Sequence, residues 1–350
     1  MRTKEKYDLI IIGAGPGGSA AALAAAKRCS VAVIERRERC GVPVQCGEYA
    51  PLLLKRLAPW ESRFAAQYLE GFDGFICGEK SFSRDAPGYV LRRSLYDGAL
   101  AAAAADAGVD FFQPAKAVDC TGNGVIIDVG GARRELKSSF LIGADGPRSL
   151  IRQWFGLREQ PLMPAVQWSL TLASPLKRAE FYFDPRFRWG YGWLFPKGDT
   201  ANVGVAARTE PGERLTSLLS AFARRLVEAG RLRPGPPLAK SGGWIPVGGP
   251  DVTMIFPRCL FVGDAGGFAH PVSGSGIVNA VLTGRLAGEA VTAALNGSAE
   301  GIAGYDRAWR RLLGRPLDRA AENRRLLQLG WTDDEERFRR LILHCWGPFS

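Results

Sequence analysis

The hydrophobic positions at the start of the chain fall into two short uninterrupted runs on either side of an alanine-rich segment. Residues 7–12 (YDLIII) and 31–34 (VAVI) are continuous apolar runs, which are typical of strands buried on both faces of a parallel sheet. The alanine-rich segment from Ser19 to about Arg28 is predicted to form a helix. This order predicts a strand–helix–strand unit of an α/β fold.

The same pattern of a buried strand followed by glycine returns twice. Residues 139–142 (SFLI) and 259–262 (CLFV) are apolar and each run is followed by glycine. An apolar helix is predicted from Val278 to about Leu295. These segments extend the predicted sheet of the first domain, although more than a hundred residues separate them.

Aromatic and β-branched residues dominate between Arg152 and Arg258, where the pattern indicates strands. One helix, 215–229, interrupts them. Together with the region 72–89, these strands predict an antiparallel sheet that forms a second lobe. The predicted strands are 165–173, 179–184, 191–195 and 202–207.

The two lobes therefore alternate along the chain. The fold class is predicted to be α/β, with a Rossmann-like domain, an interleaved antiparallel β-sheet lobe and C-terminal helices. The first domain takes residues 1–60, 88–155 and 256–298. The second lobe takes residues 61–87 and 156–255, and residues 299–350 form a C-terminal helical segment.

Length and composition agree with a two-lobed globular protein. The chain has 350 residues, of which 46% are hydrophobic and 23% charged, so a sizeable core can form. The longest uncharged stretch, Leu9 to Ala26, is interrupted by Gly-Pro-Gly-Gly and is not expected to span a membrane. No secretory signal is visible, so we expect a cytoplasmic protein.

The charge favours anionic partners. The formal net charge is +11, with 36 Arg against 10 Lys, which suits phosphates or lipid head groups. No nucleic-acid recognition motif is found, so no nucleic-acid partner is expected. The seven cysteines are irregularly spaced without C-x-x-C, and there are only two His, so neither a disulfide framework nor a metal site is expected.

The first glycine-rich turn has the spacing of a dinucleotide site. Gly13, Gly15 and Gly18 form G-x-G-x-x-G between the first strand and its helix. Gly13 permits a tight turn, Gly15 lets the backbone approach a pyrophosphate, and Gly18 lets helix and strand pack closely. Glu35, at the end of the second strand, can accept hydrogen bonds from a ribose. The neighbouring candidates are Pro16, Gly17 and Arg36.

Two later glycine turns are Gly143-Ala144-Asp145-Gly146 and Gly263-Asp264, the latter continuing to Pro271-Val272-Ser273-Gly274-Ser275-Gly276-Ile277. Together with the first turn they complete a pattern that resembles the flavoprotein hydroxylase superfamily, whose cofactor is FAD. The resemblance implies that Asp264 binds the ribityl chain and that Asp145 lies near the pyrophosphate. It also implies that a helix starting near Ile277 points its positive end at the flavin. An Arg-x-x-x-Asp segment implies that Arg93 contacts FAD and leaves Asp97 as a surface acid.

Three further segments narrow the resemblance: residues 191–196 (YGWLFP) followed by Gly204, residues 44–48 (VQCGE) and residues 244–246 (WIP). Within that superfamily they resemble, in turn, the aromatic signature of the geranylgeranyl reductases, their cysteine loop and the stretch before their last FAD motif. The signature's final glycine is Ala206 here, and only some 55 residues follow the last motif. A shorter or more polar substrate is therefore also compatible with the sequence.

The resemblance implies that reduced FAD delivers hydride to a carbon–carbon double bond of an isoprenoid chain. Tyr191 and Trp193 would line the substrate pocket, and Cys46, followed by Gly47, would lie near the flavin. The sequence contains no second G-x-G-x-x-G, so NAD(P)H or a ferredoxin would be a transient electron donor.

Alternatives remain open at this stage. Tyr191 and Trp193 could be an ordinary packed pair on one strand face, and Cys46 a small buried hydrophobe. His270 is a candidate proton donor, although a lone loop histidine is more often incidental. The Arg-rich tail from 307 to 340 is either a solvated helical face or a surface for a diphosphate or an anionic membrane.

At the level of function, an FAD-dependent aromatic monooxygenase shares every FAD motif but not the aromatic and cysteine segments. A non-catalytic or electron-carrying flavoprotein is the third alternative.

Overall fold

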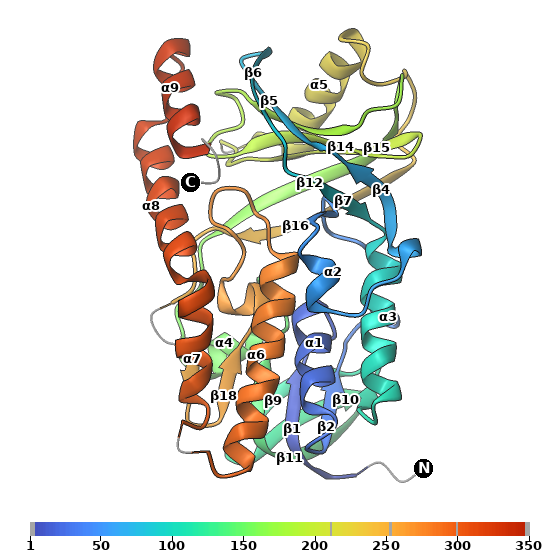
Figure 1. Cartoon of the computed structure of the whole chain (residues 1–350), viewed down its shortest axis with the longest axis vertical. Helices are drawn as coiled ribbons and strands as arrows, with labels where there is room; N and C mark the ends of the chain where they lie inside the picture. The colour runs from blue at the N-terminus through green and yellow to red at the C-terminus, as the bar shows by residue number, and fades with distance from the viewer. Residues whose placement is uncertain (1–3, 211, 252–253, 299, 347–350) are drawn as a thin grey trace.

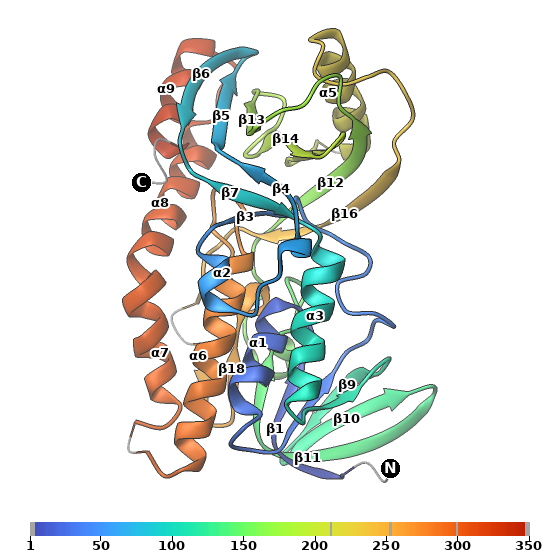
Figure 2. The same cartoon turned by 45° about the vertical axis from the view of Figure 1, so that its right-hand side comes forward.

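The computed structural model describes residues 4–210, 212–251, 254–298 and 300–346. Two lobes are stacked along the long axis of the molecule, and a helical arm from the C-terminal part of the chain runs along one side of both (Figures 1 and 2). The predicted fold class is confirmed. No helix in the described part of the chain is long and apolar enough to cross a bilayer; the apolar stretch from Leu9 divides into a strand and a helix.

The first lobe is built on a sheet with the strand order β17-β18-β11-β1-β2-β8. Neighbours from β18 to β8 run parallel, and β1 and β2 are almost wholly buried, as their continuous apolar sequences predict. A hairpin of β9 and β10, which the sequence analysis did not predict, pairs with the first half of β11. The strands are β1 (Lys6–Ile12), β2 (Val31–Ile34), β8 (Asp110–Phe112), β9 (Lys116–Thr121), β10 (Gly124–Val129), β11 (Ala132–Gly143), β17 (Ile255–Phe256) and β18 (Cys259–Phe261).

Three helices lie side by side in front of this sheet (Figure 1). They are α1 (Pro16–Ala25), α3 (Arg93–Asp106) and α6 (Ile277–Leu295). The helices α1 and α6 approach closely because glycines face backbone at their crossing. A Cβ placed on Gly284 would lie 2.0 Å from the Gly17 carbonyl oxygen, and one on Gly288 would lie 2.4 Å from that of Ala21. The short helix α4 (Leu150–Trp154) follows β11.

The second lobe is a seven-stranded sheet with the order β16-β12-β15-β14-β13-β5-β6. The four strands predicted between 165 and 207 are present, and most pairs are antiparallel. The pair β13–β5 is parallel, which corrects the expected all-antiparallel sheet; no hairpin joins these two strands, so nothing forces opposite directions. The strands are β5 (Gly71–Ile76), β6 (Glu79–Arg84), β12 (Leu162–Thr171), β13 (Arg178–Phe183), β14 (Tyr191–Lys197), β15 (Thr200–Ala206) and β16 (Ala239–Pro246).

The side chains of β14 alternate between the two faces of the second sheet, and each face has its own hydrophobic core. Tyr191, Trp193 and Phe195 face the first lobe and the arm, whereas Leu194 faces helix α5 (Leu215–Glu228), which covers the other side of the sheet. This is the period of two expected of a strand that is buried on both faces. A small sheet of β3 (Tyr49–Pro51), β4 (Ala65–Leu69) and β7 (Gly88–Leu91), with the short helix α2 (Leu54–Leu57), connects the lobes.

The arm consists of α7 (Ala303–Trp309), a π-helical turn (Arg310–Gly314), α8 (Arg315–Gly330) and α9 (Glu335–Trp346). It packs on the first lobe through Trp309, whose ring lies 5.0 Å from that of Phe268, and on the second lobe through Leu327, Phe338 and Ile342. The predicted helices are present. Leu312, in the π-helical turn, is 45% exposed.

Candidate active site

A cavity of about 570 Å³ lies where the two lobes and the arm meet. Residues from all three parts of the chain line it, and among them are most of the residues singled out from the sequence. The predicted residues that line it are Gly15, Pro16, Gly17, Cys46, Gly47, Arg93, Tyr191, Trp193, Gly263, Asp264, Gly274, Gly276 and Ile277.

The first glycine turn has the geometry that the motif predicts. Gly13 has a φ of +102°, and a Cβ on Gly18 would lie 1.9 Å from the Gly13 carbonyl oxygen, so both positions require glycine. Nothing lies within 4 Å of a Cβ placed on Gly15, so the backbone there faces open space at the N-terminus of α1. Unpaired backbone N–H groups at this helix end suit a pyrophosphate.

Glu35 is buried behind this turn. One carboxylate oxygen accepts a hydrogen bond from the backbone N–H of Ala14 at 2.7 Å, and the other accepts one from that of Arg37 at 2.8 Å. The carboxylate therefore fixes the glycine turn to the segment after β2. Arg36 is exposed and does not line the cavity.

The Asp264 carboxylate borders the cavity and accepts no hydrogen bond from any residue that the structure describes. Burial raises its pKa to about 6, although the nearby positive charge of Arg93 lowers it. Asp264 is half-buried, and a carboxylate in that position without donors from the protein can take them from a ligand. The hydroxyl groups of a ribityl chain are such donors, so Asp264 and the open glycine turn fit FAD.

Asp145 has a different position from Asp264. Its carboxylate accepts a hydrogen bond from the backbone N–H of Leu150 at 2.7 Å, at the start of α4, and does not line the cavity. Gln160, which no motif indicated, connects the two Gly-Asp turns: its side-chain N–H group donates to the carbonyls of Pro147 at 2.7 Å and Asp264 at 2.8 Å.

Arg93 lines the cavity, but Asp97 is not the surface acid that was expected. The Asp97 side chain is only 3% exposed and forms a two-bonded ion pair with Arg93, with both N–O distances 2.7 Å. The two residues lie one turn apart on α3, so their side chains meet on one face. Asp97 thus fixes the Arg93 guanidinium beside Cys46 and Asp264. Burial raises the pKa of both groups, and the positive charge of Arg93 opposes that effect in each.

The loop before α6 brings its N-terminus to the cavity. Gly274 has a φ of +68° and Gly276 is the N-cap of the helix, whereas Pro271 is buried away from the cavity. His270 lines the cavity, but its Nδ1 accepts the backbone N–H of Ser273 at 3.1 Å, and burial lowers its pKa to about 4. It is therefore neutral at pH 7, which argues against its role as a proton donor.

A network that sequence reasoning missed holds the Cys46 turn against the second lobe. The Trp193 indole N–H donates to the side-chain oxygen of Gln167 at 2.9 Å, and the Gln167 amide donates to the Cys46 carbonyl at 3.1 Å. Burial raises the pKa of the Cys46 thiol, so its sulfur is protonated at pH 7. Trp193 is thus both a cavity wall and a support for the turn beside it.

Glu48 also holds the Cys46 turn in place, through the contacts of its carboxylate. Its carboxylate accepts hydrogen bonds from the Arg93 backbone N–H at 2.9 Å and from the Asn202 side chain at 2.8 Å, and it pairs with Lys197. It has a φ of +69°, a conformation that few side chains adopt. Glu48 belongs to the motif at 44–48, but Asn202 is a polar position in a largely apolar strand and gave no signal.

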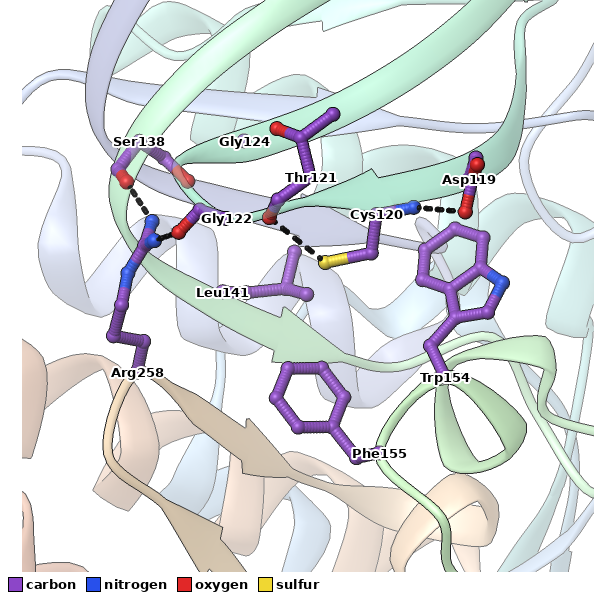
Figure 3. Close-up of a pocket in the computed structure, with 10 residues that line it drawn as sticks. All are labelled: Asp119, Cys120, Thr121, Gly122, Gly124, Ser138, Leu141, Trp154, Phe155 and Arg258. Carbon is purple, nitrogen blue, oxygen red and sulfur yellow. Dashed lines mark hydrogen bonds between the residues drawn. The ribbon is translucent and has the colours of Figure 1, made fainter.

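A second hollow of about 400 Å³ lies on the far side of the first sheet (Figure 3). It is formed by the β9–β10 hairpin, β11, Trp154, Phe155 and Arg258, and contains none of the predicted site residues. The Arg258 guanidinium donates to backbone carbonyls, among them that of Ser139 at 3.1 Å. Its donors serve to hold strands together.

Comparison with known proteins gives consistent matches. The family model of the NAD(P)-binding Rossmann-like domain matches residues 11–67. The digeranylgeranylglycerophospholipid reductase of Methanocaldococcus jannaschii is 33% identical over 322 residues, covering 87% of this chain and 82% of that protein. The protein of the same name from Methanothrix thermoacetophila is 32% identical, covering 90% and 85%.

Solved structures agree on the fold. A geranylgeranyl bacteriochlorophyll reductase-like protein from Thermoplasma acidophilum has a TM-score of 0.79 and 25% identity, covering 99% of this chain and 98% of that one. A flavin-dependent brominase, at 18% identity, has a TM-score of 0.72 and covers 97% and 98%. At that identity, the second match shows a shared fold alone.

Proposed function

The chain belongs to the geranylgeranyl reductase family of FAD-dependent oxidoreductases, and from this premise we propose that it reduces carbon–carbon double bonds in the prenyl chains of a glycerophospholipid. The observation that carries the proposal is the composition of one cavity. A half-buried carboxylate and two helix N-termini suited to FAD line it together with aromatic rings suited to an apolar chain.

The residues that would hold the cofactor are those with unused donors or acceptors at the cavity. The open turn at Gly15 would bind the pyrophosphate, Asp264 would accept hydrogen bonds from the ribityl chain, and the N-terminus of α6 would face the flavin ring. When bound, reduced FAD supplies a hydride for the alkene carbon.

The protein's own part is to orient the alkene and to keep water away. The rings of Phe181, Tyr191 and Trp193 give an apolar wall, and the Tyr191 hydroxyl is satisfied by the Ser273 carbonyl, so the wall offers no polar competitor to an alkene. Reduction also requires a proton. The Cys46 thiol holds one at pH 7 because burial raises its pKa, and it borders the same cavity.

We further propose that electrons arrive from a transient donor, either NAD(P)H or a ferredoxin-type protein. The proposal is supported by the presence of one dinucleotide motif in the sequence, which the cofactor uses.

Peripheral contact with an anionic membrane surface is proposed for the arm. Arg311, Arg315 and Arg319 recur every four residues, are exposed, and form no ion pair with other residues that the structure describes, unlike Arg310 and Arg325. Leu312 is exposed among them. Cations around an exposed leucine suit anionic head groups. Flotation with vesicles should increase with anionic lipid content; flotation that does not depend on that content would contradict the proposal.

The test of the proposed function is an anaerobic single turnover. The FAD-loaded protein is reduced with dithionite without excess and mixed with digeranylgeranyl glycerophospholipid, and the flavin absorbance is followed. Reoxidation without oxygen supports the proposal. Flavin that stays reduced with every prenyl lipid, but reoxidises in air with hydroxylation of an aromatic compound, would favour a monooxygenase instead.

A further inference from the structure

The apolar end of the cavity is closed from behind by a residue of the arm. Trp346, at the end of α9, is 5% exposed, and its ring centroid lies 4.9 Å from that of Tyr191 and 5.3 Å from that of Phe181. Both of those rings line the cavity, whereas Trp346 does not. The indole is therefore the second layer of the wall, and it also contacts Phe183 at 4.8 Å.

Trp346 is held in place by contacts of α9 that are independent of the cavity. Arg339 donates to the Ser81 hydroxyl at 2.9 Å and pairs with Glu79 at 2.8 Å, both on β6. The Asn323 side chain, on α8, donates to the backbone carbonyl beside Trp346 at 3.4 Å. The end of the arm is thus tied to β6 of the second lobe and to α8 of the arm itself, and the indole has a fixed backing.

The two rings in front of Trp346 differ in how they are restrained. Tyr191 is tied through its hydroxyl to the Ser273 carbonyl. Phe181 is held by ring contacts alone, which besides Trp346 are with Phe72 at 5.4 Å, Phe195 at 5.2 Å and Tyr191 at 5.6 Å. If the indole is removed, Phe181 has room to turn back into the vacated space, and Tyr191 keeps its position. The cavity would then deepen at its apolar end.

We propose that Trp346 is a specificity-determining residue that limits the length of prenyl chain the cavity accepts. The inference rests on the proposed function and adds to it: the far end of the chain would rest against Phe181 and Tyr191, with Trp346 as their backing. A chain with further isoprene units would meet this wall before its alkene reached the flavin side. The limit is set by the arm, not by the sheet that carries the aromatic signature.

The test measures kcat/KM with geranyl, farnesyl, geranylgeranyl and longer prenyl lipids of one head group. Trp346→Ala is compared with Trp346→Phe, which keeps a ring, and with Trp309→Phe, which alters another tryptophan of the arm, one that contacts Phe268 away from the cavity end. We expect Trp346→Ala to raise the ratio of the longest to the geranylgeranyl lipid by about tenfold or more, because even one methylene changes selectivity by roughly 10- to 200-fold. Trp346→Phe should give a smaller change and Trp309→Phe none.

Two failures are distinguishable. If the wild-type protein reduces these lipids but the length ratio is the same in all folded, FAD-containing variants, Trp346 is only a core residue and the inference is wrong. If the wild-type protein reduces none of them, the proposed function fails and the inference falls with it. Should Trp346→Ala not fold, Trp346→Leu and Trp346→Phe must still shift the ratio in the same direction, and an unchanged ratio in both would overturn the inference.

Discussion

Asp264 should make FAD binding dependent on pH. Its pKa is raised from 3.8 to about 6 in the protein without ligand, chiefly by burial. A ribityl hydroxyl donates to the ionised carboxylate, so binding favours the deprotonated form. With a pKa of about 6, the apparent Kd should be nearly constant above pH 7 and about tenfold higher at pH 5. Binding below pH 6 should release a proton.

Raising the pH strengthens FAD binding but lowers the stability of the protein without FAD. Because the pKa of Asp264 is higher in the folded than in the unfolded protein, protonation of Asp264 favours the folded state of the protein without FAD. It loses up to about 3 kcal/mol of stability as pH rises from about 4 to 6. Of the other groups at the cavity, Arg93 stays charged over this range, and His270, with a pKa of about 4, is largely neutral above pH 5.

The assay is fluorescence titration of apoprotein with FAD from about pH 5 to pH 8. Asp264→Asn should bind about 10- to 100-fold more weakly, because a hydrogen bond to a charged group is lost, and its Kd should not vary with pH. Asp145→Asn should keep the pH dependence, because its carboxylate serves the start of α4. A pH-independent Kd in the wild type, or an unaltered dependence in Asp264→Asn, would refute this reasoning.

Three further predictions concern single side chains. Gly15→Ala should leave the thermal midpoint of the apoprotein unchanged but weaken FAD binding, because its methyl group enters the open space proposed for the pyrophosphate. Gly18→Ala should lower the midpoint, because its methyl group meets the Gly13 carbonyl. Equal midpoints for the two variants would contradict the roles assigned to these glycines. Trp193→Phe should retain FAD but lower prenyl reduction, because the hydrogen bond to Gln167 is lost, and loss of FAD would instead make it a core residue. Arg324 is a buried cation with no carboxylate partner among the described residues, burial lowers its pKa to about 10, and its side chain donates to the Trp189 backbone carbonyl. Arg324→Met should therefore stabilise the protein by about 1–3 kcal/mol in denaturant titration; destabilisation would show that the bond to the carbonyl matters more.

The parts of the fold that could be predicted are those with local signals. The strand at 7–12 and the turn at Gly13 follow from an apolar run that ends in a fixed glycine spacing, and β14 follows from its aromatic residues. The parallel pairing of β5 with β13 could not be predicted, because it joins segments about a hundred residues apart without a diagnostic turn.

The same distinction applies to the site. Asp264 is recognisable because Gly-Asp ends a buried strand. Asp97 was misjudged because its burial depends on Arg93 and on the loop at Gly41, whose Cβ position lies 2.8 Å from the Asp97 Cβ. Gln160 and Gln167 each bridge segments that are distant in sequence through one amide group, and single polar residues of this kind have no signature in one sequence.

The central claim is that one cavity brings a reduced flavin and a prenyl double bond together. The direct measurement is mass spectrometry of digeranylgeranyl glycerophospholipid after anaerobic incubation with the FAD-loaded, dithionite-reduced protein, in parallel with Trp193→Ala. The account predicts a gain of two hydrogen atoms for each bond reduced, and a much smaller yield with the variant at equal FAD content. An unchanged lipid mass in the presence of bound, reduced flavin would contradict it.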